Sequence, residues 1–212
     1  MLRQVRAMRW TNNTLVVATK NRGKASEFAA LFEPLGVRAL SLHDVDPVPD
    51  IVEDGETFLD NARKKARAVA EQLRLPVLAD DSGLCVDLLG GAPGVYSARY
   101  AGEGAGDAAN NDKLLRELAL RLPGDFAGHL LSPARFVCSL VLYDPASGEE
   151  IRAEGECAGY IVKEPRGGGG FGYDPLFYVP EFGRTMAELD PETKNRISHR
   201  ARAMGKLLEQ FR

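Results

Sequence analysis

Several features that define special classes of protein are missing from this sequence of 212 residues. No apolar run approaches the roughly 20 residues that a helix needs to cross a bilayer. The first ten residues are basic but lack the apolar core of a signal peptide, so we do not expect secretion. What is left is a globular protein, and the ordinary balance of 44% hydrophobic and 27% charged residues agrees with that.

Cysteine is scarce, and so is an excess of charge of either sign. Three cysteines, Cys85, Cys138 and Cys157, have no metal-ligand spacing, and we expect reduced, mostly buried thiols in a cytoplasmic protein. The net charge of −3 gives no overall attraction to nucleic acid or to an anionic membrane, so we expect neither as a partner. A polyanionic substrate would therefore have to be held by cations gathered locally.

Strand-like runs alternate with helical patterns along the chain. The length allows one large α/β domain or two closely packed lobes. Residues 135–143 and 151–162 read as a hairpin, so we predict an α/β fold with a mixed twisted sheet flanked by helices. The other expected strands are residues 15–19, 76–80, 84–88 and 176–179. A turn at Ser82-Gly83 is expected between residues 76–80 and 84–88. The expected helices follow Lys24, Thr57, Asp107 and Asp190.

A basic motif lies between the first expected strand and the first expected helix. A helix N-terminus offers unpaired N–H groups and a partial positive charge, which suit phosphate, and Gly23 would let a ligand approach the backbone. The spacing is not that of a P-loop, so an ordinary basic turn is the alternative. The residues of this motif are Thr19, Lys20, Asn21, Arg22, Gly23 and Lys24.

Two adjacent carboxylates, Asp80 and Asp81, follow a strand that we expect to be buried. Such a pair needs a cation or hydrogen-bond donors to stay ionised. Because Mg²⁺ takes one or two protein carboxylates together with phosphate oxygens, the pair indicates a metal–nucleotide site. The alternative is an Asp pair that caps a tight turn. Glu53 and Lys65, before and inside the second expected helix, are further candidates, although each fits a solvated surface charge as well.

A glycine-rich segment, Gly167–Asp174, precedes the last expected strand. Its five glycines would weaken the interior of a strand or helix, whereas a loop that brings backbone against a flat ligand would use them. Phe171 and Tyr173 offer aromatic faces for a base, and such stacking contributes roughly 1–3 kcal/mol. A flexible surface loop with one anchored Phe is the alternative.

A basic run, Lys194–Arg200, lies at or near the start of the last expected helix. If this helix starts near Ser198, His199 and Arg200 lie in its first turn, where cations oppose the helix dipole. Cations in this unfavourable position indicate a functional role, with an anionic or carbonyl-rich partner. If the helix starts at Pro191, the same residues form a solvated basic face.

Taken in order, these segments resemble the inosine triphosphate pyrophosphatase family (Ham1-like), whose members remove deaminated purine nucleoside triphosphates. The resemblance extends from Leu15 to Phe211, so residues 14–212 form the expected enzyme domain. Residues 1–13 are an N-terminal extension that could be an unprocessed leader or a disordered end. Two positions depart from the family pattern: Lys20 replaces a small residue, which leaves the course of the phosphate loop open, and Cys157 replaces a Trp found in some members. The most specific blocks are TKNRGK, ETFLDNARKKA, ADDSGLCVDLLGGAPGVYSARYAG, GGFGYDPLF and KNRISHRA.

The resemblance implies a role for each motif. Residues 19–24 match the phosphate loop, and Lys65 matches a phosphate-binding lysine. Glu53 and Asp81 match the magnesium ligands, Asp81 also matches the general base, and Ser82 matches a substrate contact. Asp80 is left as a supporting carboxylate whose share of the work stays open. The base-recognition residues match Phe171, Gly172, Tyr173, Asp174, Lys194, His199 and Arg200.

The resemblance also implies the architecture, the reaction and the partners. We expect two intimately packed lobes with the active site in the cleft between them, and a cytoplasmic homodimer. The expected reaction is Mg²⁺-dependent hydrolysis of ITP, dITP or XTP to the monophosphate and pyrophosphate. The alternatives are a related pyrophosphatase for other modified nucleotides and a nucleotide-binding regulator that does not hydrolyse.

Base selection follows from hydrogen-bond donors in this interpretation. Hypoxanthine and xanthine present an acceptor at position 6, where adenine presents an amino donor. Arg200 only donates, and His199 can donate from at least one nitrogen. Facing adenine, each donor would be left unpaired at a cost of roughly 1–3 kcal/mol. We therefore expect Arg200→Ala to reduce ITP turnover much more than it disturbs folding.

Overall fold

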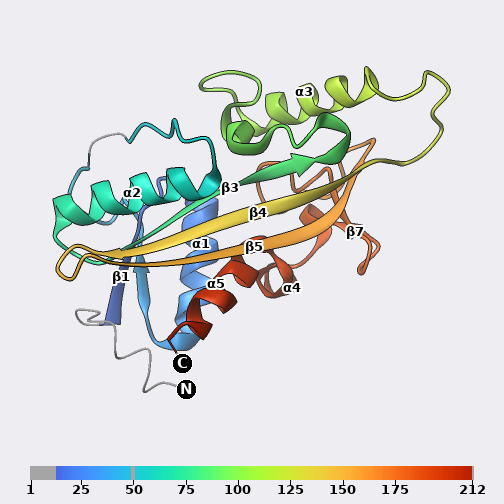
Figure 1. Cartoon of the computed structure of the whole chain (residues 1–212). Helices are drawn as coiled ribbons and strands as arrows, with labels where there is room; N and C mark the ends of the chain where they lie inside the picture. The colour runs from blue at the N-terminus through green and yellow to red at the C-terminus, as the bar shows by residue number, and fades with distance from the viewer. Residues whose placement is uncertain (1–12, 49–50, 212) are drawn as a thin grey trace. The chain divides into compact units, whose positions relative to one another are not determined.

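The computed structural model describes residues 13–48 and 51–211 (Figure 1). The predicted N-terminal extension, residues 1–13, lies outside the described residues except for Asn13. The helices and strands, with η for short 3-10 helices, are β1 (Thr14–Val17), α1 (Arg22–Phe32), η3 (Glu33–Leu35), β2 (Arg38–Leu40), α2 (Phe58–Leu73), β3 (Val77–Val86), η4 (Asp87–Leu89), η5 (Gly94–Arg99), α3 (Asp107–Ala119), β4 (Leu130–Asp144), β5 (Glu149–Val162), β6 (Phe177–Val179), β7 (Arg184–Thr185), η6 (Met186–Glu188), α4 (Pro191–Ile197) and α5 (His199–Glu209).

The strands of the described residues form a single mixed sheet in the order β2-β1-β3-β4-β5-β6-β7. β1 pairs in parallel with β2 and β3, whereas β6 pairs antiparallel with β5 and β7. A tight turn closed by a 2.8 Å hydrogen bond from the Gly148 N–H to the Asp144 carbonyl joins β4 to β5 as a hairpin. The predicted α/β fold with a mixed sheet is confirmed.

The predicted turn at Ser82-Gly83 is wrong, because residues 77–86 form one strand, β3. Ser and Gly favour a turn locally. Burial along nearly the whole of β3 and pairing within the sheet outweigh that preference. Asp80 and Asp81 consequently lie inside a strand and do not cap a turn.

The chain divides into two compact units. Unit 1 comprises Met1–Asp81, Cys138–Gly155 and His199–Arg212, and unit 2 comprises Ser82–Val137 and Glu156–Ser198. The long strands β3, β4 and β5 contribute residues to both units. Each unit buries apolar side chains of its own, so each is described by itself below.

Unit 1 has two cores because neighbouring residues of a strand point to opposite faces of the sheet. Leu15 and Val17 of β1 pack in a cluster with α1 and α5. Val16 and Ala18, which alternate with Leu15 and Val17 along the chain, pack in a cluster with α2. The sheet of unit 1 therefore carries α1 and α5 on one face and α2 on the other (Figure 1).

Unit 2 has one core. Helix α3 buries Leu114 and Leu118 in a cluster that also contains residues of β4, β5 and β6. Phe136 and Phe177 lie in this cluster with ring centroids 4.4 Å apart, at the short limit for aromatic pairs. This core supports the glycine-rich segment that follows β5.

The last helical segment consists of two helices, so both predicted starts are present. Asp190 caps α4 by accepting the N–H of Thr193, with Pro191 at the first helical position. Ser198 has extended backbone (φ −62°, ψ 157°) and ends α4, and His199 begins α5. His199 and Arg200 thus lie in the first turn of a helix, as one of the two interpretations required.

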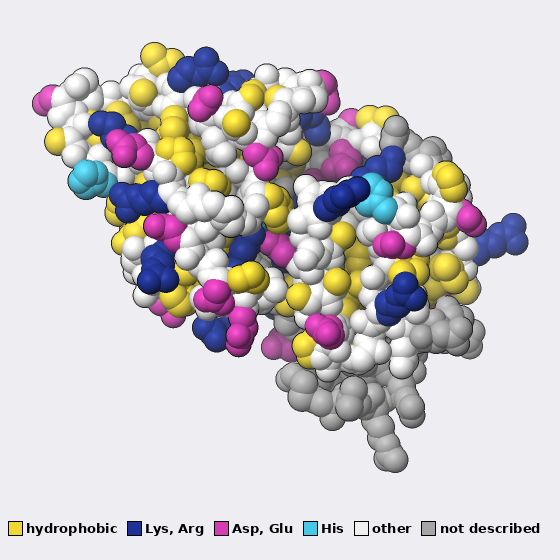
Figure 2. Space-filling model, turned by 180° about the vertical axis from the view of Figure 1, so that it is seen from behind, with side chains coloured by type: hydrophobic (Ala, Val, Ile, Leu, Met, Phe, Trp, Pro, Cys, Tyr) yellow, Lys and Arg dark blue, Asp and Glu magenta, His cyan; other side chains and the backbone are white. Residues whose placement is uncertain are grey.

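The surface carries charges of both signs. On the face seen in Figure 2, basic and acidic side chains are interspersed among the described residues, in keeping with a net charge of −3. None of the helices within residues 13–48 and 51–211 is long and apolar enough to span a membrane.

Strand β5 and helix α5 lie close together at Gly155, where a Cβ atom would overlap backbone atoms of His199 and Ala203. Gly155→Ala should therefore lower the free energy of unfolding by about 1–3 kcal/mol, as overpacking does. Chemical denaturation measures this change. Gly205→Ala on α5 is the matched control, since a Cβ there meets nothing within 4 Å, and Ala should stabilise this helix by up to about 1 kcal/mol. Equal losses in the two variants would contradict the close approach.

Candidate active site

The basic motif forms the connection from β1 to α1 in unit 1. Asn21 caps the helix, because its Oδ1 accepts the N–H of Lys24 at 3.0 Å, and Thr19 Oγ1 accepts the N–H of Asn21 at 3.1 Å. The side chain of Lys20 is exposed, and its carbonyl oxygen lies 2.9 Å from Nε2 of His43. The motif therefore lies at a helix N-terminus, as predicted, despite the departure at Lys20.

Asp80 belongs to a buried charge network on the α1 and α5 face of unit 1. Its side chain is fully buried, and its Oδ2 lies 2.9 Å from Nζ of Lys24 and 3.5 Å from Nε of Arg200. Nη1 of Arg200 donates to Oε2 of Glu27 at 2.8 Å. Burial by itself would raise the pKa of Asp80, but Lys24, Arg200 and Lys65 outweigh it and hold this pKa well below the usual range of an aspartate. Asp80 is therefore ionised at neutral pH, as a partner of the cations around it.

Asp81 points to the opposite face of the sheet, toward α2. Its Oδ2 accepts a hydrogen bond from Nδ2 of Asn61 at 3.0 Å. Burial raises the pKa of Asp81, and the charges of Lys24 and Lys65 offset only part of this effect. Asp81 is consequently the less stabilised carboxylate of the two, which is a property of groups that take up a proton or a cation.

Lys65 on α2 connects the segment before this helix to the backbone of β3. Its Nζ lies 2.9 Å from Oε1 of Glu53 and donates to the carbonyl oxygen of Asp80 at 3.0 Å. Burial would lower the pKa of Lys65, but Asp80, Glu53 and Asp81 raise it, so the ammonium group stays charged. Lys24 and Lys65 are therefore held against two acidic side chains of the candidate site, Asp80 and Glu53.

Glu53 and Asp81 could hold a divalent cation. Within the described ranges, no three or more His, Cys, Asp or Glu side chains gather into a metal-binding group. Mg²⁺ does not need such a group, since it is held by one or two carboxylates together with water and substrate phosphate oxygens. The side chain of Glu53 is 34% exposed, and the raised pKa of Asp81 is what a nearby cation would reverse. This donor set fits Mg²⁺.

The glycine-rich segment of unit 2 is held in a defined turn around Asp174. Oδ2 of Asp174 accepts the N–H of Phe171 at 2.9 Å and lies 2.6 Å from Nζ of Lys194, which is 4.7 Å from the centroid of the Phe171 ring. Gly170 has a φ of +75°, and a Cβ there would overlap the carboxylate of Asp174. These contacts argue against the alternative of a flexible surface loop.

Two side chains of helix α3 bind the backbone N–H and the carbonyl of Gly172 in this segment. The N–H of Gly172 donates to Oδ2 of Asp107 at 2.6 Å, and its carbonyl accepts from Nδ2 of Asn111 at 2.9 Å. Tyr173 is buried in the core of unit 2, and its hydroxyl donates to a backbone carbonyl at 2.8 Å. Phe171 is only half-buried, so it is the aromatic residue of this segment that offers a ring face.

The predicted site residues fall into two groups. The prediction that both groups line one cleft stays a prediction. Unit 1 contains residues 19–24, Glu53, Lys65, Asp80, Asp81, His199 and Arg200, and unit 2 contains Ser82, residues 171–174 and Lys194.

Comparison with known proteins agrees with this set of motifs. A family model described as the Ham1 family matches residues 15–210. The chain belongs to the Ham1 family. It is 55% identical over 197 residues to a dITP/XTP pyrophosphatase of Geobacillus kaustophilus, which covers 93% of each protein. It is 52% identical to a dITP/XTP pyrophosphatase of Geobacter sulfurreducens, which covers 93% of this chain and 96% of the relative.

Solved Ham1 structures have the same fold. The Ham1 protein of Coxiella burnetii has a TM-score of 0.80 at 42% identity, over 93% of this chain and 97% of that one. The Ham1 protein of Staphylococcus aureus has a TM-score of 0.77 at 40% identity, over 94% of this chain and all of that one. The likeness extends over nearly the whole chain, and the family resemblance inferred from five motifs is confirmed.

In this Ham1 protein, the contacts of Arg200 argue against one expectation drawn from the sequence. Arg200 is 3% exposed and lies against Glu27 and Asp80. Its positive charge in the first turn of α5 is therefore balanced by two carboxylates. Arg200→Ala would leave both carboxylates buried without this cation. It should therefore lower the stability of the fold in addition to removing any contact with a base.

Four residues that position the candidate groups were not predicted as site residues from the sequence: Glu27, Asn61, Asp107 and Asn111. Two of them carried a readable signal. Asn61 lies three residues after Phe58 on the apolar stripe of α2, and Glu27 precedes Phe28 on the buried face of α1. A polar residue on a buried helix face needs a partner, and that requirement alone marks both positions.

The two aspartates should respond oppositely to conversion to asparagine in the metal-free protein. Asp80→Asn removes the ionised partner of Lys24 and Arg200 and should lower the free energy of unfolding at pH 7 by about 3 kcal/mol. Asp81→Asn removes a buried carboxylate with a raised pKa and should leave thermal stability equal to or above that of the wild type.

The pH dependence of these effects follows from the two shifts. Because the folded-state pKa of Asp80 is lowered, its stabilisation is present above roughly pH 4 and is lost as the pH falls further. Because the pKa of Asp81 is raised, the cost of its charge disappears as the pH falls through that pKa. Thermal scans of both variants from pH 3 to 8 measure this. Destabilisation of the same size in both variants at pH 7 would contradict the division of roles.

Proposed function

We propose that this Ham1-family chain hydrolyses deaminated purine nucleoside triphosphates, such as ITP, dITP and XTP, to the monophosphate and pyrophosphate. Relatives 55% and 52% identical to it over 93% of its length carry the name dITP/XTP pyrophosphatase. The structural observation that carries the proposal is that Asp80 and Asp81, beside the basic loop, have different surroundings. Asp80 is neutralised by cations, whereas Asp81 has a raised pKa and faces α2.

The triphosphate is bound by the N-terminus of α1 together with two lysines. The helix end attracts anions through its dipole, and its first turn contains no acidic residue. Lys24 and Lys65 pair with Asp80 and Glu53 in the ligand-free chain. A triphosphate brings negative charge to the same two cations, so the chain gathers locally the charge that its net charge of −3 does not supply.

Glu53 and Asp81 are the residues that we propose for Mg²⁺. A cation held there would supply positive charge to offset the negative charge that develops on the phosphate oxygens. Asp80 contacts Lys24 and Arg200 on the other face of the sheet, so its part is to fix the lysine of the phosphate loop.

Asp81 also orients the attacking water and accepts its proton. A carboxylate within hydrogen-bond reach of a water can accept its proton, and a cation held by Glu53 and Asp81 would keep Asp81 in the ionised form that this role needs. The hydrogen bond from Asn61 to Oδ2 fixes the orientation of the carboxylate. Phosphoryl transfer depends mainly on positioning and charge, so an oriented water beside two lysines supplies the main requirements.

The glycine-rich segment and Lys194 of unit 2 are the groups that we propose for recognition of the purine base. Phe171 stacks on the purine ring. The hydrogen bond from its backbone N–H to the Asp174 carboxylate sets the orientation of the glycine-rich segment. The ammonium group of Lys194 is held by the same carboxylate and donates to an acceptor such as the 6-oxo group. Adenine has an amino donor at this position and is therefore disfavoured.

The family resemblance further supports a cytoplasmic homodimer as the working form. Both are part of the proposal.

A turnover panel with and without Mg²⁺ tests the proposed function. Pyrophosphate release should require Mg²⁺, and kcat/KM for ITP, dITP and XTP should exceed that for ATP by about 10- to 100-fold, the effect of leaving the Lys194 donor unpaired against adenine. Asp81→Asn should lower kcat by roughly 10²- to 10⁴-fold. Preference for a modified pyrimidine triphosphate would favour a related pyrophosphatase, and nucleotide binding without pyrophosphate release would indicate a regulator. Either result would overturn the proposal.

A further inference from the structure

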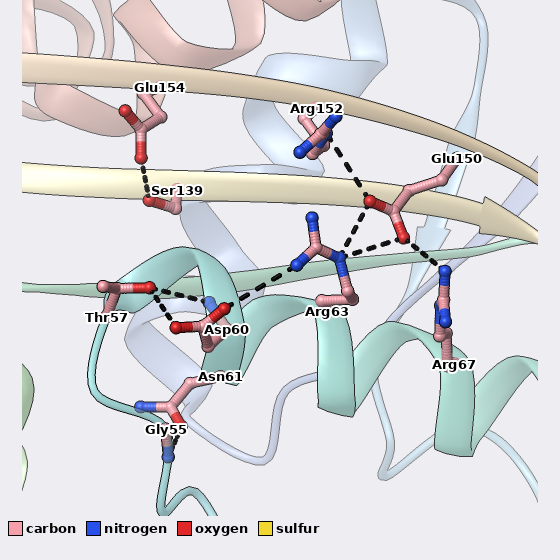
Figure 3. A network of polar contacts seen from close by, with 10 residues as sticks. All are labelled: Gly55, Thr57, Asp60, Asn61, Arg63, Arg67, Ser139, Glu150, Arg152 and Glu154. Carbon is pink, nitrogen blue, oxygen red and sulfur yellow. Dashed lines mark hydrogen bonds and ion pairs between the residues drawn. The ribbon is translucent and has the colours of Figure 1, made fainter.

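Asn61 is fully buried in the first turn of α2 and uses both ends of its amide. Its Oδ1 accepts the N–H of Gly55 at 2.7 Å, as Figure 3 shows, and its Nδ2 donates to Oδ2 of Asp81 at 3.0 Å. Only one orientation of the amide satisfies both contacts, because an N–H group needs an acceptor and a carboxylate needs a donor. Asn61 therefore joins the segment before α2 to β3 inside unit 1.

The segment that Asn61 holds is the one that carries Glu53. Three successive residues of this segment are bound by the first two turns of α2. Glu53 contacts Lys65 at 2.9 Å, Asp54 forms an ion pair with Lys64, and Gly55 contacts Asn61. The contact of Gly55 is the only backbone contact of the three, and it ends on a side chain with no freedom to move to solvent.

Helix α2 is itself fixed to the sheet of unit 1. Nε of Arg63 lies 3.0 and 3.2 Å from the two carboxylate oxygens of Glu150 on β5, and Arg67 Nη2 lies 3.1 Å from the same carboxylate (Figure 3). Side chains on such an anchored helix position a site more closely than side chains on a loop. Asn61 thus has a rigid base from which to align two other elements.

We propose that Asn61 is a positioning residue, which holds the Glu53 segment and the Asp81 carboxylate in the relative position needed to bind one divalent cation. The inference rests on the proposed function, because it takes Glu53 and Asp81 as the carboxylates that hold the ion. Residues behind metal ligands typically change metal affinity or activity by 10- to 100-fold when they are substituted. Asn61 does not itself bind the cation or the substrate in this account.

Two variants separate the two contacts of Asn61. Asn61→Ala removes both. Gly55→Ala keeps Asn61 and its bond to Asp81, but the new Cβ would lie 2.7 Å from Asn61 Oδ1 and 2.9 Å from Asp60 Cβ, so the segment must move away. Gly55→Ala retains every polar side chain, so it keeps the test valid if Asn61→Ala does not fold.

Asn110→Ala is the matched control. Asn110 is 3% exposed on α3 in unit 2, accepts the Ala101 N–H at 2.8 Å and donates to the Ala98 carbonyl at 3.2 Å. Like Asn61 it is a buried Asn that accepts a backbone N–H, but its amide donates to a backbone carbonyl, and neither bond involves residues 51–56 or Asp81. Its loss should lower thermal stability about as much as the loss of Asn61.

The first measurement uses the metal-free protein. Hydrogen exchange of the amides in residues 51–56 should be at least about tenfold faster in Asn61→Ala and Gly55→Ala than in the wild type, and unchanged in Asn110→Ala. Binding of Mn²⁺ without nucleotide, followed by electron paramagnetic resonance, should weaken by about 10- to 100-fold in the first two variants alone.

The second measurement is the Mg²⁺ concentration that gives half-maximal turnover of ITP. It should rise by about 10- to 100-fold in both variants. Excess Mg²⁺ should restore kcat in Gly55→Ala, whereas Asn61→Ala should keep a lower kcat because Asp81 has lost its donor.

Wild-type exchange and wild-type Mg²⁺ dependence in both variants would overturn the inference, and so would equal effects in Asn110→Ala. If turnover by the wild type is itself independent of divalent cations, the proposed function fails instead, whatever the variants do.

Discussion

Neighbouring side chains of a β-strand point to opposite faces, and in unit 1 this rule separates Asp80 from Asp81. Leu78 and Asp80 face α1 and α5, whereas Ala79 and Asp81 face α2. Two carboxylates that are adjacent in the chain therefore have different surroundings. One is enclosed by cations with a lowered pKa, and the other is buried with a raised pKa. The candidate site of unit 1 depends on this separation.

Because Asp80 and Asp81 lie on opposite faces, each face of the sheet in unit 1 makes a different set of contacts. On the α1 and α5 face, Asp80 fixes Lys24 at the basic loop and shares Arg200 with Glu27. On the α2 face, helix α2 supplies Asn61 and Lys65, which connect Asp81 and the Asp80 backbone to the segment of Glu53. The charge of Asp80 stabilises the fold, and the charge of Asp81 costs stability and suits it to chemistry.

Local signals in the sequence predicted most of the framework. The helix expected after Thr57 is present as α2, and Thr57 caps it by accepting the N–H of Asp60 at 3.1 Å. The turn expected at Ser82-Gly83 was wrong, because pairing within the sheet is not a local property. Asn61 was missed because its partner Asp81 is 20 residues away, and Glu27 because Arg200 is 173 residues away. A single sequence does not reveal which distant groups meet.

Titration of the two carboxylates by nuclear magnetic resonance tests the central claim most directly. In the metal-free wild type labelled with ¹³C at the aspartate carboxyl carbon, the signals of Asp80 and Asp81 report each ionisation separately. We expect a pKa for Asp80 below the usual aspartate range and a pKa for Asp81 above it. Two signals that titrate together within the usual range, or in the reverse order, would contradict it.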